Sequence, residues 1–222
     1  MIDLLEAIKE RHSVRSYTDK KIEGSIKENL LEMINECNKE SGLNIQACFN
    51  EPNAFASLIS RYGKFSNVKN YIALVGPDND DLQEKCGYYG EKIVLYAQQL
   101  GLNTCWVALT YNRWKCPCVI NPGEKLCLVI AIGFGTTKGI LHKIKSIKDT
   151  STVEGDMPKW FKNGMESVLL APTAINQQKF HYTLKGNTVS AKAGLSFFSK
   201  VDLGITKYHF EIGAGKENFK WL

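Results

Sequence analysis

The sequence predicts a layered fold of helices and strands, of the α/β or α+β class, and two observations carry this prediction. Residues 71–75 (Tyr-Ile-Ala-Leu-Val) form an apolar run that ends at Gly76-Pro77, which is typical of a strand buried on both faces. Around it, helical and extended apolar patterns follow in the order strand, long helix, strand, loop, strand. Such an order indicates stacked layers of helix and sheet.

The first third of the chain predicts two helices and a strand. Asp3 can cap a first helix, whose apolar face begins with Leu4 and Leu5. A second helix is predicted to begin at the capping box Ser25-Ile26-Lys27-Glu28. Its apolar stripe has helical spacing and comprises Ile26, Leu30, Leu31, Ile34 and Cys37. Alternating apolar residues between positions 43 and 49 then predict a strand.

The remaining elements follow from the same patterns and from turn residues. They are a helix over about residues 80–100, strands at 103–108 and 126–132, a helix at 160–170, and strands at 180–184 and 188–193. Gly101 is the predicted C-cap of the long helix, and Gly186-Asn187 predicts a hairpin turn. The alternating segment Lys143–Lys148 fits an edge strand protected by lysines.

The last third of the chain repeats part of the plan of the first. In both, a helix leads through a loop into a strand, and both loops carry an Asn-x-Gln element, Asn44-Ile45-Gln46 and Asn176-Gln177-Gln178. This repetition supports the hypothesis of an internal duplication, with halves at about 1–110 and 111–222.

Composition narrows the class of protein. With 222 residues, 44% of them apolar, the chain can bury a core in one domain or in two small ones. No apolar run reaches the roughly 18 residues of a membrane span, and the N-terminus lacks the pattern of a secretion signal. Seven cysteines are an odd number, and most lie among apolar residues, so we expect free thiols in the reducing cytoplasm.

Charge and ligand spacing disfavour two further classes. The net charge of +5 is carried by 24 lysines and only 4 arginines, which is typical of a solvated surface. Because the arginines and paired exposed aromatic residues of a nucleic-acid-binding module are missing, the composition disfavours a nucleic acid as a partner. Cys116-Pro117-Cys118 has no second closely spaced pair, so no metal site is predicted.

A cluster of polar residues directly after the first helix is the first candidate for function. Arg11-His12-Ser13-Val14-Arg15 offers two guanidinium groups, an imidazole and a hydroxyl. Arginine binds phosphate oxygens with two parallel hydrogen bonds. The cluster can therefore hold a phosphate and reach further along the same ligand, although a solvated basic helix end has the same composition.

Three segments together resemble the FMN-dependent nitroreductase superfamily. They are Arg11–Arg15, the loop Pro172-Thr173-Ala174-Ile175-Asn176-Gln177-Gln178, and Gly101–Ala108. The late position of the loop is similar to the subgroup in which one chain holds two nitroreductase-like halves. Lys179 departs from the Pro-Trp that follows the glutamine in the family, and no basic C-terminal residues match those that help to hold phosphate.

The resemblance implies an α+β fold, with a central, mostly antiparallel sheet flanked by helices, and FMN as the cofactor. On this basis Arg11 binds the phosphate, Ser13 binds the phosphate or the ribityl chain, and His12 adds a donor. Arg15 reaches the pyrimidine edge, where a fixed positive charge favours the reduced ring.

The loop and the central strand supply the other implied contacts. Asn176 suits the N3–H and O4 of the ring, because its amide both donates and accepts. Pro172 and Thr173 shape the loop, and Gln178 contacts the ring edge. A backbone N–H that faces flavin N5 is expected from Ala108, Leu109 or Thr110. Among nearby aromatic residues we expect Trp106 in the core, whereas Tyr111 and Trp114 are open between core and ring face.

These residues predict an FMN-dependent oxidoreductase that passes hydride from NAD(P)H to a small electron-poor acceptor, such as a nitroaromatic or a quinone. No catalytic side chain is predicted, because the cofactor carries the hydride chemistry. The alternatives are a flavin-destroying or dehalogenating enzyme of the same fold, and a non-enzymatic module that binds flavin or nucleic acid. As a pseudo-dimer the chain is expected to be a monomer; otherwise a homodimer is expected.

Overall fold

The computed structural model describes residues 2–222 and has an α+β fold with two four-stranded sheets. The first sheet has the strand order β1-β2-β4-β3 and is antiparallel throughout. Its strands are β1 (Gln46–Cys48), β2 (Tyr71–Pro77), β4 (Glu124–Gly133) and β3 (Asn103–Val107). The predicted α+β class with an antiparallel sheet and flanking helices is therefore confirmed.

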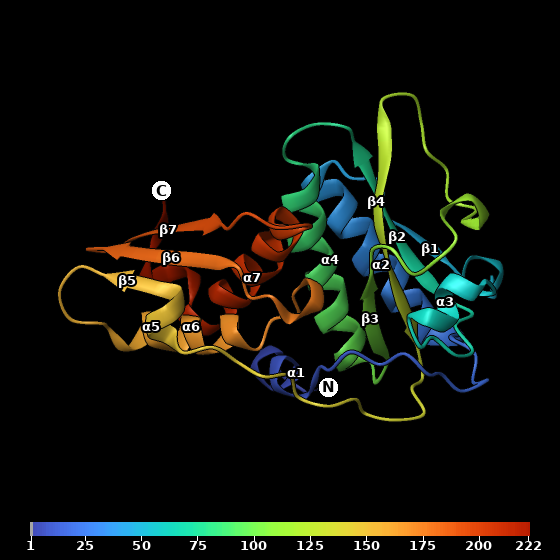
Figure 1. Cartoon of the computed structure of the whole chain (residues 1–222), viewed down its shortest axis with the longest axis horizontal. Helices are drawn as coiled ribbons and strands as arrows, with labels where there is room; N and C mark the ends of the chain where they lie inside the picture. The colour runs from blue at the N-terminus through green and yellow to red at the C-terminus, as the bar shows by residue number, and fades with distance from the viewer. Residues whose placement is uncertain (1) are drawn as a thin grey trace.

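The second sheet lies at the other end of the molecule and is mixed (Figure 1). Its strands, in spatial order, are β5 (Ser151–Val153), β6 (Phe180–Lys185), β7 (Thr188–Ala193) and β8 (Lys220–Trp221). The central pair β6 and β7 is antiparallel, and the two outer pairs are parallel. Lys185 pairs with Thr188, which confirms the hairpin turn predicted at Gly186-Asn187.

Helices fill the space between the two sheets, with α4 and α7 at the centre (Figure 1). The helices are α1 (Leu4–Glu10), α2 (Gly24–Ser41), α3 (Leu58–Tyr62), α4 (Leu82–Gln99), α5 (Ile147–Thr150), α6 (Lys159–Leu169) and α7 (Ser199–Ala214). Two glycines allow α4 and α7 to approach closely. A Cβ at Gly87 would lie 2.0 Å from the Val201 oxygen, and one at Gly204 would lie 2.0 Å from the Glu84 oxygen.

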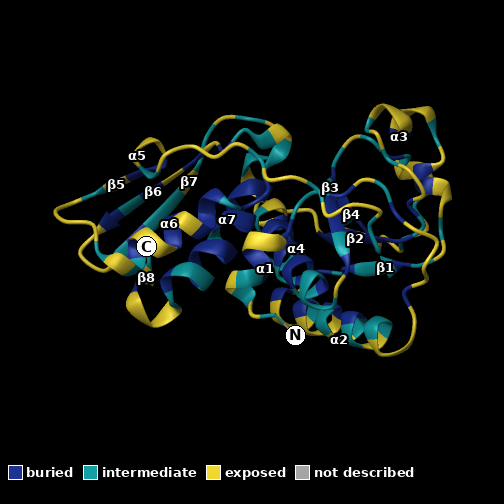
Figure 2. Cartoon of the chain, turned by 90° about the horizontal axis from the view of Figure 1, so that it is seen from below, coloured by how far each residue is buried: buried dark blue, intermediate teal, exposed yellow. Residues whose placement is uncertain are grey.

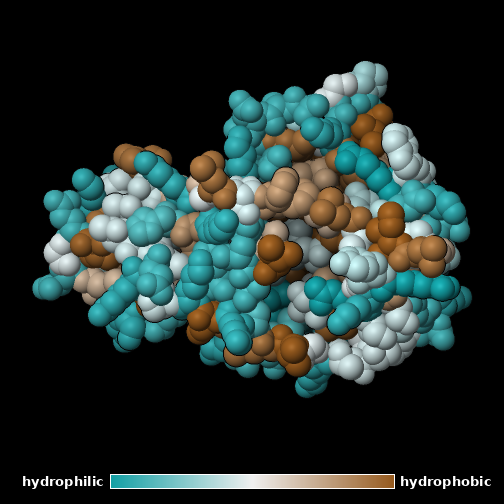
Figure 3. All heavy atoms as spheres, viewed as in Figure 1, coloured by the Kyte–Doolittle hydropathy of each residue, from teal (hydrophilic) through white to brown (hydrophobic). Residues whose placement is uncertain are grey.

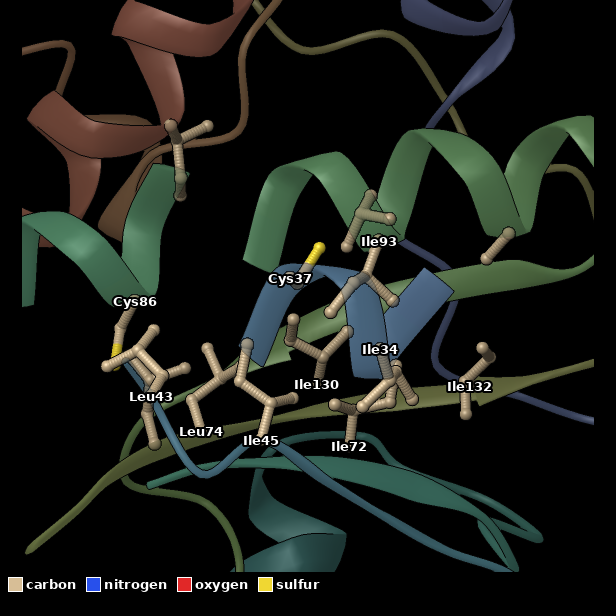
Figure 4. Close-up of a cluster of buried hydrophobic side chains, with 14 of the residues drawn as sticks. Ile34, Cys37, Leu43, Ile45, Ile72, Leu74, Cys86, Ile93, Ile130 and Ile132 are labelled. Atoms are coloured by element: carbon tan, nitrogen blue, oxygen red, sulfur yellow. The ribbon is translucent and has the colours of Figure 1, made fainter. Parts of the chain in front are cut away.

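Each sheet packs a core against these central helices, where the two cores meet (Figure 2), and a further buried cluster covers the other face of the first sheet. In the first core, Ile34 and Cys37 from α2 and Ile93 from α4 pack onto Ile72 and Ile130 of the sheet (Figure 4). The second core is aromatic and includes Phe161, Tyr182, Phe210 and Phe219. The rings of Tyr182 and Phe210 stack with centroids 5.1 Å apart. Each sheet with its helices forms one layered part of the molecule, and the surface where the two parts face each other can carry a site.

Several local predictions are confirmed. Asp3 caps α1 by accepting the N–H of Glu6 at 2.8 Å. Residues 71–75 of β2 are 0% exposed, as expected for a strand buried on both faces. Gly101 takes the left-handed φ of 78° directly after α4, so it ends the helix, although the cap residue itself is Leu100.

Two predicted elements are wrong. The capping box at Ser25 is not formed, because α2 begins one residue earlier at Gly24, which takes a φ of 59°. Segment Lys143–Lys148 is not an edge strand: it runs as an extended loop into α5. The backbone groups of Lys143 and Lys145 bond to side chains of the 172–178 loop instead of a neighbouring strand.

The two sheets limit where the chain could be divided into two halves. The first sheet contains β4, which lies beyond residue 110, and the two sheets differ in strand direction. Any division of the chain that keeps each sheet whole falls after Gly133 and before Ser151. Of the helices within residues 2–222, none is long and apolar enough to cross a membrane.

Candidate functional site

A cavity of about 430 Å³ lies where the two layered parts of the molecule face each other. Such a volume is within the roughly 300–1,000 Å³ typical of cofactor and small-molecule sites. Apolar side chains gather near the middle of the face shown in Figure 3, where the surface is hollowed. The first wall of the cavity consists of Ser13, Arg15, Gly63, Phe65, residues 106–110 and Leu128. The second wall consists of residues 172–175, Gln177, residues 196–198, Val201, Asp202 and Ile205.

The first wall is built by main-chain hydrogen bonds. The segment after α1 runs alongside β3, where the N–H of Val14 donates to the carbonyl of Thr104 at 3.0 Å. Because successive side chains of an extended segment point to opposite sides, Val14 is buried, whereas Ser13 and Arg15 line the cavity. The Arg15 guanidinium lies 6.0 Å from the ring centroid of Phe65. The pattern thus places one fixed cation at the cavity.

The second wall is a strained loop. Three of its residues have left-handed φ values although none is glycine: Ile175 at 46°, Asn176 at 56° and Gln178 at 46°. Such conformations cost about 1–3 kcal/mol each and persist only where the surroundings hold them. The loop is therefore expected to depend on specific side-chain contacts.

Residues 143–145, which we call the strap, hold the outer side of this loop. Gln178 accepts the N–H of Lys145 at 2.9 Å and donates to the carbonyl of Lys143 at 2.8 Å. Asn176 also donates to the Lys143 carbonyl, at 2.8 Å. Neither Asn176 nor Gln178 lines the cavity, whereas Gln177 between them does.

Asp202 at the start of α7 holds the inner side of the loop. Its side chain is 3% exposed, and its two oxygens accept the N–H of Ala174 at 3.0 Å and the amide of Gln177 at 2.6 Å. Burial raises the pKa of this carboxyl from 3.8 to about 6, although the two donors lower it. The edge of the cavity thus carries a buried carboxyl with a raised pKa.

A buried polar group lies behind the first wall. Glu91 on α4 is 0% exposed and accepts the indole N–H of Trp106 at 2.9 Å. Its other oxygen lies 2.9 Å from Nε2 of His209 and 3.9 Å from Nε of Arg11. Nδ1 of His209 donates to the carbonyl of Ser167 at 2.9 Å, since a carbonyl only accepts. This group joins the first wall to α7.

The cavity brings together seven of the eleven residues that the sequence predicts for the site. They are Ser13, Arg15, Ala108, Leu109, Thr110, Pro172 and Thr173. Two segments far apart in the sequence, after α1 and after α6, therefore meet at one cavity. The Leu109 side chain is 75% exposed and lies at the mouth.

The other four predicted residues lie outside the lining: Arg11, His12, Asn176 and Gln178. The Arg11 side chain is 3% exposed, and its Nε has no hydrogen-bond partner within residues 2–222. Burial and the Arg11 charge lower the pKa of His12, which packs against Gly139. A direct role at the cavity is therefore less well supported for these residues than for Ser13 and Arg15.

The three aromatic residues considered for the site lie in different environments. Trp106 was expected in the core; its ring packs against the first core and also lines the cavity. Tyr111 is buried and Trp114 is 94% exposed, and neither lines the cavity. In the part of the chain that the structure describes, no three His, Cys, Asp or Glu side chains form a group able to hold a metal ion.

Sequence reasoning missed several lining residues, above all Asp202 and Phe198. Both belong to the start of α7, a helix that is buried almost all round. A helix of that kind lacks the one-sided apolar stripe by which helices are recognised in a sequence. Gln177 was also missed, because its neighbours Asn176 and Gln178 match the family pattern better.

The fold and the cavity are those of a nitroreductase-like protein, and comparison with protein families confirms this class. The family model described as "Putative TM nitroreductase" matches residues 3–214, so the chain belongs to this family. No curated protein matches it in sequence.

Solved structures share the fold. A "putative nitroreductase" from Thermotoga maritima is 22% identical, over 97% of this chain and 85% of its own, with a TM-score of 0.68. A "putative nitroreductase" from Desulfovibrio desulfuricans, in complex with FMN, is 16% identical over 71% of this chain and 99% of its own, with a TM-score of 0.53. A nitroreductase-like family protein from Bacillus cereus is 19% identical over 67% of this chain and 94% of its own, with a TM-score of 0.51.

Proposed function

We propose that this protein is an FMN-dependent oxidoreductase that passes hydride from NAD(P)H to a small electron-poor acceptor, such as a nitroaromatic or a quinone. The observation that carries the proposal is the single cavity in which Ser13 and Arg15 face the loop of residues 172–177. Family membership and the FMN complex of the Desulfovibrio desulfuricans protein support the same cofactor. When bound, FMN supplies the hydride chemistry, while the protein binds and orients it.

The lining of the cavity fits the three parts of FMN. Arg15 is a fixed cation for an anionic or electron-rich part of the ligand. The hydroxyls of Ser13, Thr110, Thr173 and Ser196 suit a polyhydroxylated chain. The flat side chains of Phe65, Trp106, Phe197 and Phe198 suit a planar ring.

The roles of individual residues follow from where each lies. Ser13 and Arg15 hold the cofactor from the first wall, and the backbone N–H groups of residues 108–110 face the ring. Those of Leu109 and Thr110 donate to no main-chain carbonyl within residues 2–222. Both hydrogens of Gln177 Nε2 donate within the protein, so Gln177 offers the ring the remaining lone pair of its Oε1. Asn176 and Gln178 fix the shape of the loop from outside.

The spectrum of the purified protein tests this function. We expect a yellow protein, or one that takes up added FMN with quenched flavin fluorescence, and we expect NADH or NADPH to bleach the absorbance without oxygen. Addition of a nitroaromatic or a quinone should then restore the colour. A protein that takes up no FMN would refute the proposal, and bleaching without turnover of either acceptor would favour a more specialised flavin enzyme.

We further propose that the two layered parts correspond to the two subunits of a dimeric nitroreductase, joined in one chain. The support is the cavity itself, whose walls come from residues up to β4, which contributes Leu128, and from residues after α6. Light scattering and flavin absorbance test this together. One FMN bound per monomeric chain is the expected result, whereas a homodimer with its flavin at the subunit interface would contradict it.

A further inference from the structure

The loop that forms the second wall is held on its cavity side by one buried carboxylate. We propose that Asp202 is a positioning residue whose ionised side chain clamps residues 172–178 in the conformation that takes the flavin, so that acid loosens the cofactor. This inference rests on the proposed function and deepens it, because it names the group that controls the second wall.

The hydrogen bonds around Asp202 require an acceptor at this position. The carbonyl of Phe197 only accepts, which fixes the orientation of the Gln177 amide, and Ser196 donates its hydroxyl to Oε1 of that amide. Nε2 of Gln177 therefore faces Asp202 and donates to it at 2.6 Å, and also donates to the carbonyl of Phe197 at 3.0 Å. The second oxygen of Asp202 accepts the N–H of Ala174 at 3.0 Å. One carboxylate thus fixes both a side chain of the lining and the backbone of the loop.

Because the loop is strained, its conformation depends on the contacts of Asp202. Ile175, Asn176 and Gln178 keep left-handed φ values, which surrounding contacts must maintain. The strap fixes Asn176 and Gln178 from outside. On the cavity side Asp202 holds both the N–H of Ala174 and the side chain of Gln177, whose amide also bonds to Ser196 and Phe197. Loss of the carboxylate charge would therefore release the side that faces the ligand.

Titration can remove this clamp in an accessible pH range. Burial raises the pKa of Asp202 to about 6. A protonated carboxyl carries a hydrogen on one oxygen and accepts more weakly on both, so the bonds to Gln177 and Ala174 weaken as the pH falls. The charged groups on the surrounding elements are Arg15 across the cavity, Lys145 and Lys179 beside the loop, Lys200 on α7, and the Glu84–Lys207 pair of α4 and α7.

FMN affinity measured against pH, in the full chain, tests the clamp. In the unaltered protein we expect constant affinity above about pH 7 and a loss of up to tenfold per pH unit below about 6, the limit for one proton. Asp202→Asn removes the charge at the same size, and its amide opposes that of Gln177. We expect it to bind FMN about tenfold or more weakly at pH 7.5, the effect of one charge-assisted hydrogen bond, and to lose the step near pH 6.

A reciprocal exchange separates positioning from a general structural role. In Asp202→Asn combined with Gln177→Glu, the amide at 202 donates to the carboxylate at 177, and the Ser196 hydroxyl still donates to that carboxylate. Only the bond to the Phe197 carbonyl is lost. The double variant should regain part of the affinity that Asp202→Asn loses. Asp156→Asn makes the same chemical change at an exposed residue and should bind FMN as the unaltered protein does.

The outcomes separate this inference from the proposed function. If FMN binds but its affinity does not change between about pH 5 and 7.5, or the step persists in Asp202→Asn, the clamp is refuted while the function stands. If no FMN binds at all, the function fails, and hydrogen exchange of the Ala174 amide decides the clamp alone. Protection of that amide should then be lost in Asp202→Ala, and retained protection would overturn the inference.

Discussion

The two walls of the cavity are built in different ways. The first is held by main-chain hydrogen bonds, such as Val14 to Thr104 and Ser66 to Arg15 at 2.9 Å, so its shape is nearly independent of side-chain identity. The second is a strained loop whose shape depends on the side chains of Asp202, Gln177 and Gln178. Substitutions in the first wall should therefore change ligand contacts, whereas substitutions in the second should change the wall itself.

The largest effect is expected at the group that joins the two walls. Glu91→Ala removes the partner of Trp106 and His209 and leaves the buried Arg11 charge without a counterion. Breaking a buried charged pair on one side costs about 3–5 kcal/mol. Urea unfolding should therefore show a free energy of unfolding lower by about that amount.

Glu91→Gln is the matched control. It keeps an acceptor for the Trp106 indole and a side chain of the same size, so we expect a smaller loss. If Glu91→Ala changed the unfolding free energy by less than about 1 kcal/mol, the typical effect of an ordinary substitution, the buried group would not join the walls.

The second effect is a dependence of stability on pH that comes from the second wall. Because the pKa of Asp202 rises from 3.8 to about 6 on folding, the folded state takes up a proton before the unfolded state does. The charged carboxylate therefore lowers stability fully above about pH 6, and this penalty disappears as the pH falls below about 4. Two pKa units correspond to about 3 kcal/mol.

Asp202→Asn lacks this penalty at every pH. The difference in unfolding free energy between Asp202→Asn and the unaltered protein should therefore favour the variant more at pH 7 than at pH 4, by up to about 3 kcal/mol. Any constant effect of the Asn side chain cancels from this comparison. An equal difference at both pH values would show that Asp202 keeps its ordinary pKa in the folded protein.

The difference between the walls also explains how far the sequence could predict the site. Ser13 and Arg15, which the family resemblance places at the cofactor, line the cavity because an extended segment alternates its side chains. Gln178 was predicted in place of Gln177, since the direction of each side chain depends on left-handed residues that no residue type in this loop announces. Asp202 was missed because its partners lie 25 and 28 residues away.

The same difference between local patterns and long-range contacts explains which elements of the fold were predicted. The apolar run of β2 and the helical stripe of α2 are local patterns, and both were predicted. Helix α7 is buried on nearly every side, and its close contact with α4 depends on Gly204 and Gly87. Its environment is therefore set by partners distant in sequence, and no stripe marks it.

A third effect concerns the outer anchor of the second wall. Gln178→Ala removes three side-chain hydrogen bonds, to Lys143, Lys145 and Asn176. It leaves the N–H of Lys145 unsatisfied, whereas the Lys143 carbonyl keeps its bond from Asn176. We expect a loss of about 2–3 kcal/mol in unfolding free energy, together with weaker FMN binding. The φ of 46° adds no new strain, since both residues carry a Cβ.

Gln98→Ala is the control, because Gln98 lies on α4 away from the cavity. Its stability should change by less than about 0.5 kcal/mol. If the Gln178 variant unfolded like the Gln98 variant, the strap would not hold the loop.

The smallest effect on stability is expected in the first wall. Arg15 is exposed and its backbone bonds do not depend on its side chain, so Arg15→Ala should change the unfolding free energy by less than about 0.5 kcal/mol. FMN affinity should nevertheless fall by about 1.5–3 kcal/mol, the value of a hydrogen bond to a charged group. Titration by flavin fluorescence measures this loss.

Riboflavin lacks the phosphate, so its affinity shows which part of FMN Arg15 contacts. If Arg15 contacts the pyrimidine edge, Arg15→Ala should weaken FMN and riboflavin equally; a loss confined to FMN would place Arg15 at the phosphate. Arg11→Ala should behave in the opposite way, because its side chain is buried beside Glu91: stability falls more than FMN affinity. Two arginines four residues apart would then serve different purposes, one within the core and one at the ligand, and equal effects of both variants would contradict that division.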